Sequence, residues 1–274
     1  MEDILTDFSE TPSVRSAIKA NWENYHYFLG RSPRAELSIG RYLTWLITDV
    51  PDHFMNLVLC TELPPYGIDL LIGNALDHFK DMNISRLSWL AKEGLPATEL
   101  KNQLLAHGLT FRESFAIEMA ADLMELPEDS SMPAGLKIIA VEDKKRLEQW
   151  IHIASIGFGV PARSESTWCD IFTDAVLEQP FRTYLALLNG EPVASSQLFL
   201  SAGVAGIYNV ICLPNVRGQG IGTAITLAPL LEARRMEHRI GILQASQMGY
   251  KVYRRLGFQE FGKLSVYLWE RETL

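Results

Sequence analysis

Residues 216–222 read VRGQGIG and place three glycines between an apolar run and a helical pattern. Such a density is costly, because glycine loses more chain entropy on folding than any other residue. A glycine loop that follows a strand and opens a helix presents unpaired N–H groups beside the positive end of the helix dipole, which suits phosphate. The alternative interpretation is a tight strand-to-helix turn without a ligand.

Two common phosphate-binding loops do not fit this segment. A Walker loop ends in Gly-Lys-Ser/Thr, whereas Gly222 is followed by Thr223 and Ala224. The dinucleotide fingerprint GxGxxG also fits poorly, because Gly218, Gly220 and Gly222 alternate and residue 223 is threonine. That fingerprint is expected in the first βαβ unit, whereas this loop comes late in the chain.

Two motifs do match a known pattern. Residues 217–222 (RGQGIG) resemble the pyrophosphate-binding motif Q/R-x-x-G-x-G/A of the GCN5-related N-acetyltransferases, or GNATs, which bind acetyl-coenzyme A. Residues 253–258 (YRRLGF) are similar to the Y-x-x-x-G-F signature that follows the family's fifth strand. Together the motifs extend the resemblance over about 136–270, and the pair is far more specific than either motif alone.

The resemblance implies roles for the residues at the motif positions. The main chain of 210–212 would bind the pantetheine arm where two strands separate, and the N–H groups of 217–222 would hold the pyrophosphate. The implied cofactor-binding residues are Val210, Ile211, Cys212, Arg217, Gly218, Gln219, Gly220, Ile221, Gly222, Thr223 and Ser246. The side chain of Arg217 would otherwise face solvent, and Thr223 would otherwise be a plain helix residue. Ser246 stands where many relatives carry asparagine.

The implied reaction is attack of an amine on a thioester carbonyl. It needs a neutral nitrogen, a donor for the developing oxyanion and a proton for the departing thiolate. The expected catalytic groups are the Tyr253 hydroxyl as acid and the Cys212 N–H as oxyanion donor. A phenol has a pKa of about 10 and a thiol of about 8.5, so proton transfer is feasible. In the alternative interpretation, Tyr253 is an aromatic residue that packs under Gly257 and Phe258.

A general base is harder to find in the sequence. The candidates are Glu165, Glu178 and Asn209, each of which is also explained as a surface or strand residue. Water is the fourth candidate. The histidines lack the spacing of a metal site, so no metal is expected.

Composition limits the partners. A net charge of −8 disfavours a nucleic-acid backbone, which needs clustered Lys and Arg, and it tolerates a cationic amine. No apolar run is long enough to span a membrane, and the acidic N-terminus argues against a secretory signal, so we expect a cytoplasmic protein. Cys60, Cys169 and Cys212 are far apart and form no disulfide or CxxC pattern. The expected partners are acetyl-CoA and an amine acceptor, with a homodimer as a candidate assembly.

The pattern of elements places these motifs in an α/β domain. Residues 126–135 (LPEDSSMPAG) have the composition of an exposed connector. After it, periodicity predicts strands at 136–141, 182–188, 192–200, 206–213, 240–246 and 263–269. Helices are expected at 144–159, 164–177 and 220–236, with a short one ending at residue 256. The glycine loop thus joins a strand to a helix.

The first half resembles the second. Residues 104–119 and 253–268 share a helix end, a Gly-apolar pair and a closing strand, and a strand at 53–60, a helix at 68–82 and a strand at 84–92 precede them. Where the loop would be stands ELPPYGID, in which Pro64 and Pro65 remove two N–H donors. Leu104 matches Tyr253. We therefore predict a degenerate, non-catalytic GNAT-like half, with an unrelated α/β domain as the alternative.

The prediction for the whole chain is a mixed α/β sheet protein with the GNAT acyl-CoA N-acyltransferase fold in two tandem domains. Residues 1–126 form the degenerate domain, 127–135 the linker and 136–274 the catalytic domain. The expected activity is transfer of an acetyl group from acetyl-CoA to a primary amine of a small molecule or peptide. The alternative function is a non-catalytic acyl-CoA-binding or regulatory protein.

Overall fold

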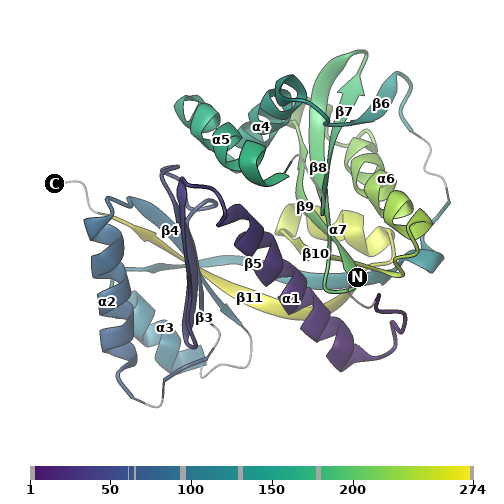
Figure 1. Ribbon diagram of the computed structural model, residues 1–274. Helices are drawn as coiled ribbons and strands as arrows, with labels where there is room; N and C mark the ends of the chain where they lie inside the picture. The colour runs from purple at the N-terminus through teal and green to yellow at the C-terminus, as the bar shows by residue number, and fades with distance from the viewer. Residues whose placement is uncertain are drawn as a thin grey trace. The chain divides into compact units, whose positions relative to one another are not determined.

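The computed structural model describes residues 4–60, 62–64, 66–92, 97–128, 132–176 and 180–271. The chain divides into two compact units, and neither is one continuous segment. The first unit joins Met1–Ser32 to Ile117–Gly262, and the second joins Pro33–Ala116 to Lys263–Leu274. Figure 1 labels the helices and strands of both units.

The first unit is built on a mixed sheet with the strand order β6-β7-β8-β9-β10-β5. Neighbouring strands are antiparallel except β9 and β10, which are parallel. The turn predicted at Asn189 and Gly190 joins β7 to β8 with φ of 51° and 93°, the conformation of a type I′ hairpin turn. The strands are β5 Thr110–Asp122, β6 Leu136–Ala140, β7 Phe181–Leu188, β8 Glu191–Ser201, β9 Val204–Cys212 and β10 Ile240–Ala245.

Helices cover both faces of this sheet, and Figure 1 shows α6 and α4 on opposite sides of β8. Ile207 of β9 packs in one core with Leu227 of α6, whereas its neighbour Val204 packs in another with Ile18 of α1. This alternation is the two-residue period of a strand. The helices are α1 Thr11–Leu29, α4 Lys144–Phe158, α5 Glu165–Val176, α6 Ile221–Arg235 and α7 Gln247–Arg255, with short 3-10 turns at η1 Leu123–Glu125, η2 Ala162–Ser164 and η3 Pro214–Val216.

The second unit has the strand order β1-β2-β3-β4-β11, in which β3 and β4 are parallel. Its core gathers Ile72 and Phe79 of α2, Leu104 of α3 and Trp89 of β4, all fully buried. The elements are β1 Ala35–Ile39, β2 Leu43–Thr48, β3 Leu57–Cys60, α2 Ile68–Asp81, β4 Arg86–Lys92, α3 Ala97–Ala106 and β11 Gln259–Glu270.

Each unit takes a strand from the other half of the sequence. In the first unit β5 pairs with β10, and in the second β11 pairs with β4. These two strands are the ones that follow the helix ends of α3 and α7 in the repeat that the sequence predicts. The repeated segments therefore form matching elements, and both closing strands are exchanged.

Two details differ from the sequence expectations. The compact units do not follow the expected boundary at 127–135, because residues 117–122 of β5 pair with β10 and α1 packs on the sheet of the first unit. The strand expected at 53–60 begins only at Leu57. The Asn56 amide donates to the carbonyls of Val50 and Asp52, which holds the preceding residues in a turn.

Candidate functional site

The strands β9 and β10 separate part-way along their length. Their parallel pairing covers only Ala205–Ile207 on β9 and Gly241–Leu243 on β10. Beyond those residues β9 continues to Cys212 and β10 to Ala245. A gap with unpaired main-chain groups therefore opens within the sheet, as the resemblance predicts for the pantetheine arm.

A β-bulge at Asn209 reorients β9 beside this gap. The register pairs Gln197 with Tyr208 and Ser195 with Ile211, so β9 contains one residue more than β8. Asn209 has φ of 52°, and its Nδ2 donates to the Tyr25 hydroxyl at 2.8 Å and to Gln197 Oε1 at 3.2 Å. Bulges of this kind often re-aim a strand next to a functional site. Here a side chain from α1 holds the bulge in place.

The main chain after the bulge faces the gap at every second residue. The Leu213 N–H donates to the Val193 carbonyl at 3.0 Å, and antiparallel hydrogen bonds alternate along a strand. The main-chain groups of Val210 and Cys212 therefore face away from β8, toward the gap, whereas those of Ile211 face β8. Arg217 Nε donates to the Cys212 carbonyl at 3.0 Å, which ties the glycine loop to the end of β9.

The glycine loop is exposed and opens α6. Residues 217–220 are solvent-exposed, and Gly218 and Gly220 have φ of 77° and 82°. Gly220 is the N-cap of α6, and no side chain caps the helix. Three N–H groups of the first turn, at Ile221, Gly222 and Thr223, point out of the helix start, because intrahelical acceptors begin at Gly220 with the bond from Ala224. The loop therefore has the donor geometry of an anion site.

A proline and a serine attach α6 to the sheet. Pro229 lies inside the helix and has no N–H for the Ile225 carbonyl. The hydroxyl of Ser196, fully buried on β8, donates to this carbonyl at 2.8 Å. The hydrogen bond that proline removes from the helix is thus replaced by one to the strand.

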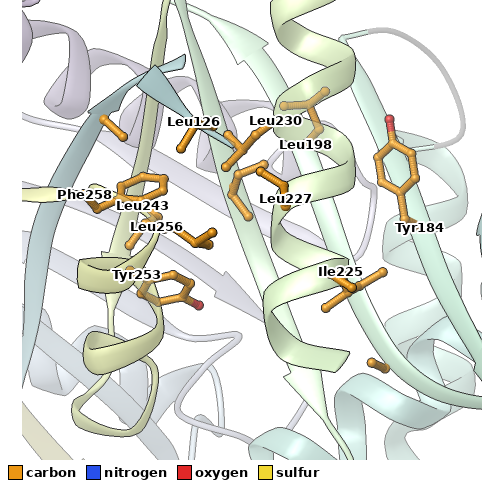
Figure 2. Packing of buried hydrophobic residues seen from close by; sticks show 14 of the residues in the cluster. Leu126, Tyr184, Leu198, Ile225, Leu227, Leu230, Leu243, Tyr253, Leu256 and Phe258 are labelled. Carbon is orange, nitrogen blue, oxygen red and sulfur yellow. The ribbon is translucent and has the colours of Figure 1, made fainter. Parts of the chain in front are cut away.

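Tyr253 is a buried member of the core between α6 and α7. It packs with Leu256 and Phe258, and Figure 2 shows its hydroxyl pointing from α7 toward α6. Burial raises the pKa of Tyr253 to about 12. The phenol therefore stays protonated at any physiological pH and is a hydrogen-bond donor.

The other predicted residues have identifiable surroundings. Ser246 is the N-cap of α7, where its hydroxyl accepts from the Gly249 N–H at 3.2 Å. The Cys212 thiol is half-buried, and burial raises its pKa. Thr223 is partly exposed in the first turn of α6, and Gln219 is exposed in the loop. Ser246 therefore has a structural hydrogen bond whatever its role toward a ligand.

The base candidates lie in different places. Glu165, at the start of α5, accepts from the buried Ser155 hydroxyl and contacts His152 Nδ1 at 3.2 Å. Asn209 uses its amide to hold the bulge, and Glu178 lies outside the described residues. Sequence reasoning missed Tyr25, although the three- and four-residue spacing of apolar residues in 14–29 is a helix signal.

Two further features were sought in the described part of the chain. It holds no group of three or more His, Cys, Asp and Glu side chains that would suit a metal ion. None of its helices combines the length and apolar character needed to cross a bilayer.

Residues 179–260, which contain β7 to α7 and both motifs, match the family model of the acetyltransferase (GNAT) domain. This chain carries a GNAT domain and has the GNAT fold. A GCN5-related N-acetyltransferase from Kribbella flavida is 20% identical, with a TM-score of 0.69 over 95% of this chain and 96% of that one. The corresponding protein from Sphaerobacter thermophilus is 17% identical, with a TM-score of 0.64 over 99% and 96%. No curated protein matches by sequence.

A tandem GNAT protein from the clavulanic acid biosynthesis pathway is also similar, at 15% identity and a TM-score of 0.61 over 100% of this chain and 98% of that one. These neighbours extend over both units, so the predicted fold class is confirmed for the whole chain. The GNAT domain places the protein among acyltransferases, which use acyl-CoA and an acceptor.

Proposed function

We propose that the first unit transfers an acetyl group from acetyl-CoA to a primary amine of a small molecule or peptide. The observation that carries this proposal is the gap between β9 and β10, which ends at a glycine loop whose N–H groups start a helix. A GNAT domain supplies the acyl transfer in general, and these residues support the coenzyme as its donor.

The residues present fit a coenzyme with a diphosphate and an amide-containing arm. The first-turn N–H groups at 221–223 would hold the diphosphate through charge-assisted hydrogen bonds. The main-chain groups of Val210 and Cys212, which face the gap, would pair with the amides of the arm as a neighbouring strand does. The Cys212 N–H would also be the donor for the oxyanion.

Tyr253 would act on the departing sulfur. Full proton transfer from a group with a pKa of about 12 to a thiolate whose thiol has a pKa of about 8.5 is uphill by ~5 kcal/mol. A hydrogen bond from the neutral hydroxyl to the developing thiolate has no such cost. The role that burial favours is therefore stabilisation of the leaving group as a thiolate.

Calorimetry with acetyl-CoA and a free-thiol assay with a panel of primary amines test the proposal together. We expect binding that coenzyme A competes for, and thiol release that depends on the amine. Tyr253→Phe should lower kcat by ~10- to 100-fold, the effect of losing a hydrogen bond to a charged group, with unchanged acetyl-CoA affinity. Binding without amine-dependent thiol release, equal in both forms, would instead favour a non-catalytic acyl-CoA-binding protein.

A further inference from the structure

Glu118 is a buried carboxylate in the first unit that the reaction described so far does not use. It lies on β5, and its side chain is 9% exposed. Among the side chains that the structure describes in this unit, no other carboxylate is buried to this degree. Burial of a charged group is costly unless something compensates it. A buried carboxylate on a strand is therefore a candidate for a role in binding.

The register places Glu118 next to the gap between β9 and β10. Glu118 is opposite Gln244, the first residue of β10 beyond the last pair, Leu243 with Ile207. One strand spacing, about 5 Å, separates neighbouring strands. The charge of Glu118 contributes to the raised pKa of Tyr208, on β9 just before the bulge. Tyr208, Gln244 and Glu118 thus form a row across three strands, which we call the polar row.

The polar row has a donor that the protein leaves unused. Gln244 Nε2 is buried and has no hydrogen-bond partner within the described residues. Buried polar atoms are nearly always paired, so an unpaired one next to a carboxylate indicates a polar ligand. Tyr208, Asn209 and Gln244 are only partly buried as residues, so this part of the sheet opens to solvent.

A glycine on β11 leaves the space that the carboxylate occupies. A Cβ built on Gly262 would collide with Glu118 Oε2. The φ of Gly262 is not in the left-handed region, so the backbone itself does not require glycine there. The main chain at this position therefore fixes where the Glu118 carboxylate lies.

We propose that the polar row is the acceptor site and that Glu118 binds the amine and accepts its proton. This inference rests on the proposed acetyl transfer and names its acceptor side. Glu118 takes the proton from the attacking nitrogen while the N–C bond forms and the C–S bond breaks. The coenzyme leaves as a thiolate, and Glu118 then releases the proton to water. Atoms and charge balance without a further reactant.

A carboxylate suits this acceptor because primary amines are ammonium ions at neutral pH. Lysine, with a pKa of about 10.4, shows the usual range. An ammonium group is attracted to a partly buried carboxylate, and a second proton acceptor is then needed only when the nitrogen attacks. Glu118 comes from the first half of the sequence, so the exchange of β5 gives the catalytic unit a residue that its own half lacks.

The test compares variants of the full chain in the free-thiol assay, with the best amine from a panel of ethanolamine, putrescine, phenethylamine, glucosamine and a lysine-containing pentapeptide. Glu118→Gln should lower kcat/KM for the amine ~100-fold or more at pH 7, in the range expected for a general base. The acetyl-CoA dissociation constant should stay within about twofold by calorimetry. Glu125→Gln, an exposed acid a few residues further along, is the control and should match wild type.

The pH profile separates a base from a structural carboxylate. In Glu118→Gln the rate should rise about tenfold per pH unit up to the pKa of the amine, because only amine already neutral in solution reacts. Wild type should depend less steeply on pH. If Glu118→Gln does not fold, Gly262→Ala, which displaces the carboxylate, should show the same loss.

Three results would overturn the inference. Wild-type kcat/KM and pH profile in Glu118→Gln, or in Gly262→Ala when the first variant is unfolded, would exclude a role for the carboxylate. A loss of acetyl-CoA affinity as large as the loss of rate would assign Glu118 a structural role. Absence of thiol release by the wild type with every amine would instead refute the proposed function, and with it the acceptor site.

Discussion

At the scale of single residues, the candidate site depends on main-chain groups, and side chains mostly hold them in place. Arg217 and Asn209 each make hydrogen bonds within the protein that fix the loop and the bulge. The motifs in the sequence identify this region because glycine is needed at Gly218 and Gly220, where φ is positive. The side-chain partners carry no such signal, so Tyr25 and Ser196 were not predictable as parts of the site.

Two glycines of the loop should respond differently to alanine. At Gly220, with φ of 82°, alanine should cost ~1–2 kcal/mol of stability and weaken acetyl-CoA binding about tenfold, or ~1.4 kcal/mol. At Gly222, in the first turn of α6, a Cβ meets nothing within 4 Å, so alanine should be neutral or stabilise the helix by up to ~1 kcal/mol. Thermal unfolding and calorimetry of the two variants check this. Equal effects at both positions would contradict it.

The buried hydroxyl of Tyr253 should make stability depend on alkaline pH. Its pKa is raised to about 12 in the folded protein, whereas an unfolded chain releases the proton near pH 10. The stabilisation is full below pH 10 and is lost as pH rises through 12, and at pH 11 the loss is ~1.4 kcal/mol. Urea unfolding should therefore show the stability of wild type relative to Tyr253→Phe falling by this amount between pH 8 and 11. A constant difference would show that Tyr253 titrates normally.

At the scale of elements, the position of α6 decides where its first-turn N–H groups point. The helix combines an interior proline with a hydrogen bond from Ser196 on β8 to the Ile225 carbonyl. The sequence predicts the helix and its start correctly, because periodicity and the glycine N-cap are local signals. It does not predict the strand partner of the proline, because that contact joins residues far apart in the chain.

A double-mutant cycle tests this attachment. Ser196→Ala should cost ~1–3 kcal/mol, because the buried Ile225 carbonyl loses its donor. In the Pro229→Ala background the new N–H can bond Ile225 within the helix, so the same substitution should cost at least ~1 kcal/mol less. Urea unfolding of the four proteins gives the coupling energy. Additive effects would show that serine and proline act independently.

At the scale of the whole molecule, the repeat and the GNAT fold were predictable, whereas the composition of the compact units was not. Segments 104–119 and 253–268 have the same local pattern, and each forms a helix end and a strand. Local pattern does not state which sheet a strand joins, and both closing strands join the sheet of the other half. The helix α1 behaves likewise, since it begins the chain yet packs on the sheet that carries the candidate site.

Because of this exchange, the predicted catalytic domain should not fold alone. A fragment of residues 136–274 lacks β5, the partner of β10, and α1, which covers Val204 and Ile242. Expressed alone it should aggregate or lack cooperative unfolding, and coexpression with residues 1–135 should restore acetyl-CoA binding. Size-exclusion chromatography and calorimetry measure both. A folded monomer of 136–274 with the affinity of the full chain would contradict this prediction.

Backbone hydrogen exchange of the full chain with and without saturating acetyl-CoA tests the central claim most directly. The account predicts slower exchange at the N–H groups of Val210 and Cys212 and of the first turn of α6, residues 221–223, because these main-chain groups would bind the coenzyme. Unchanged exchange at these positions with millimolar acetyl-CoA, or protection confined to other parts of the chain, would contradict it.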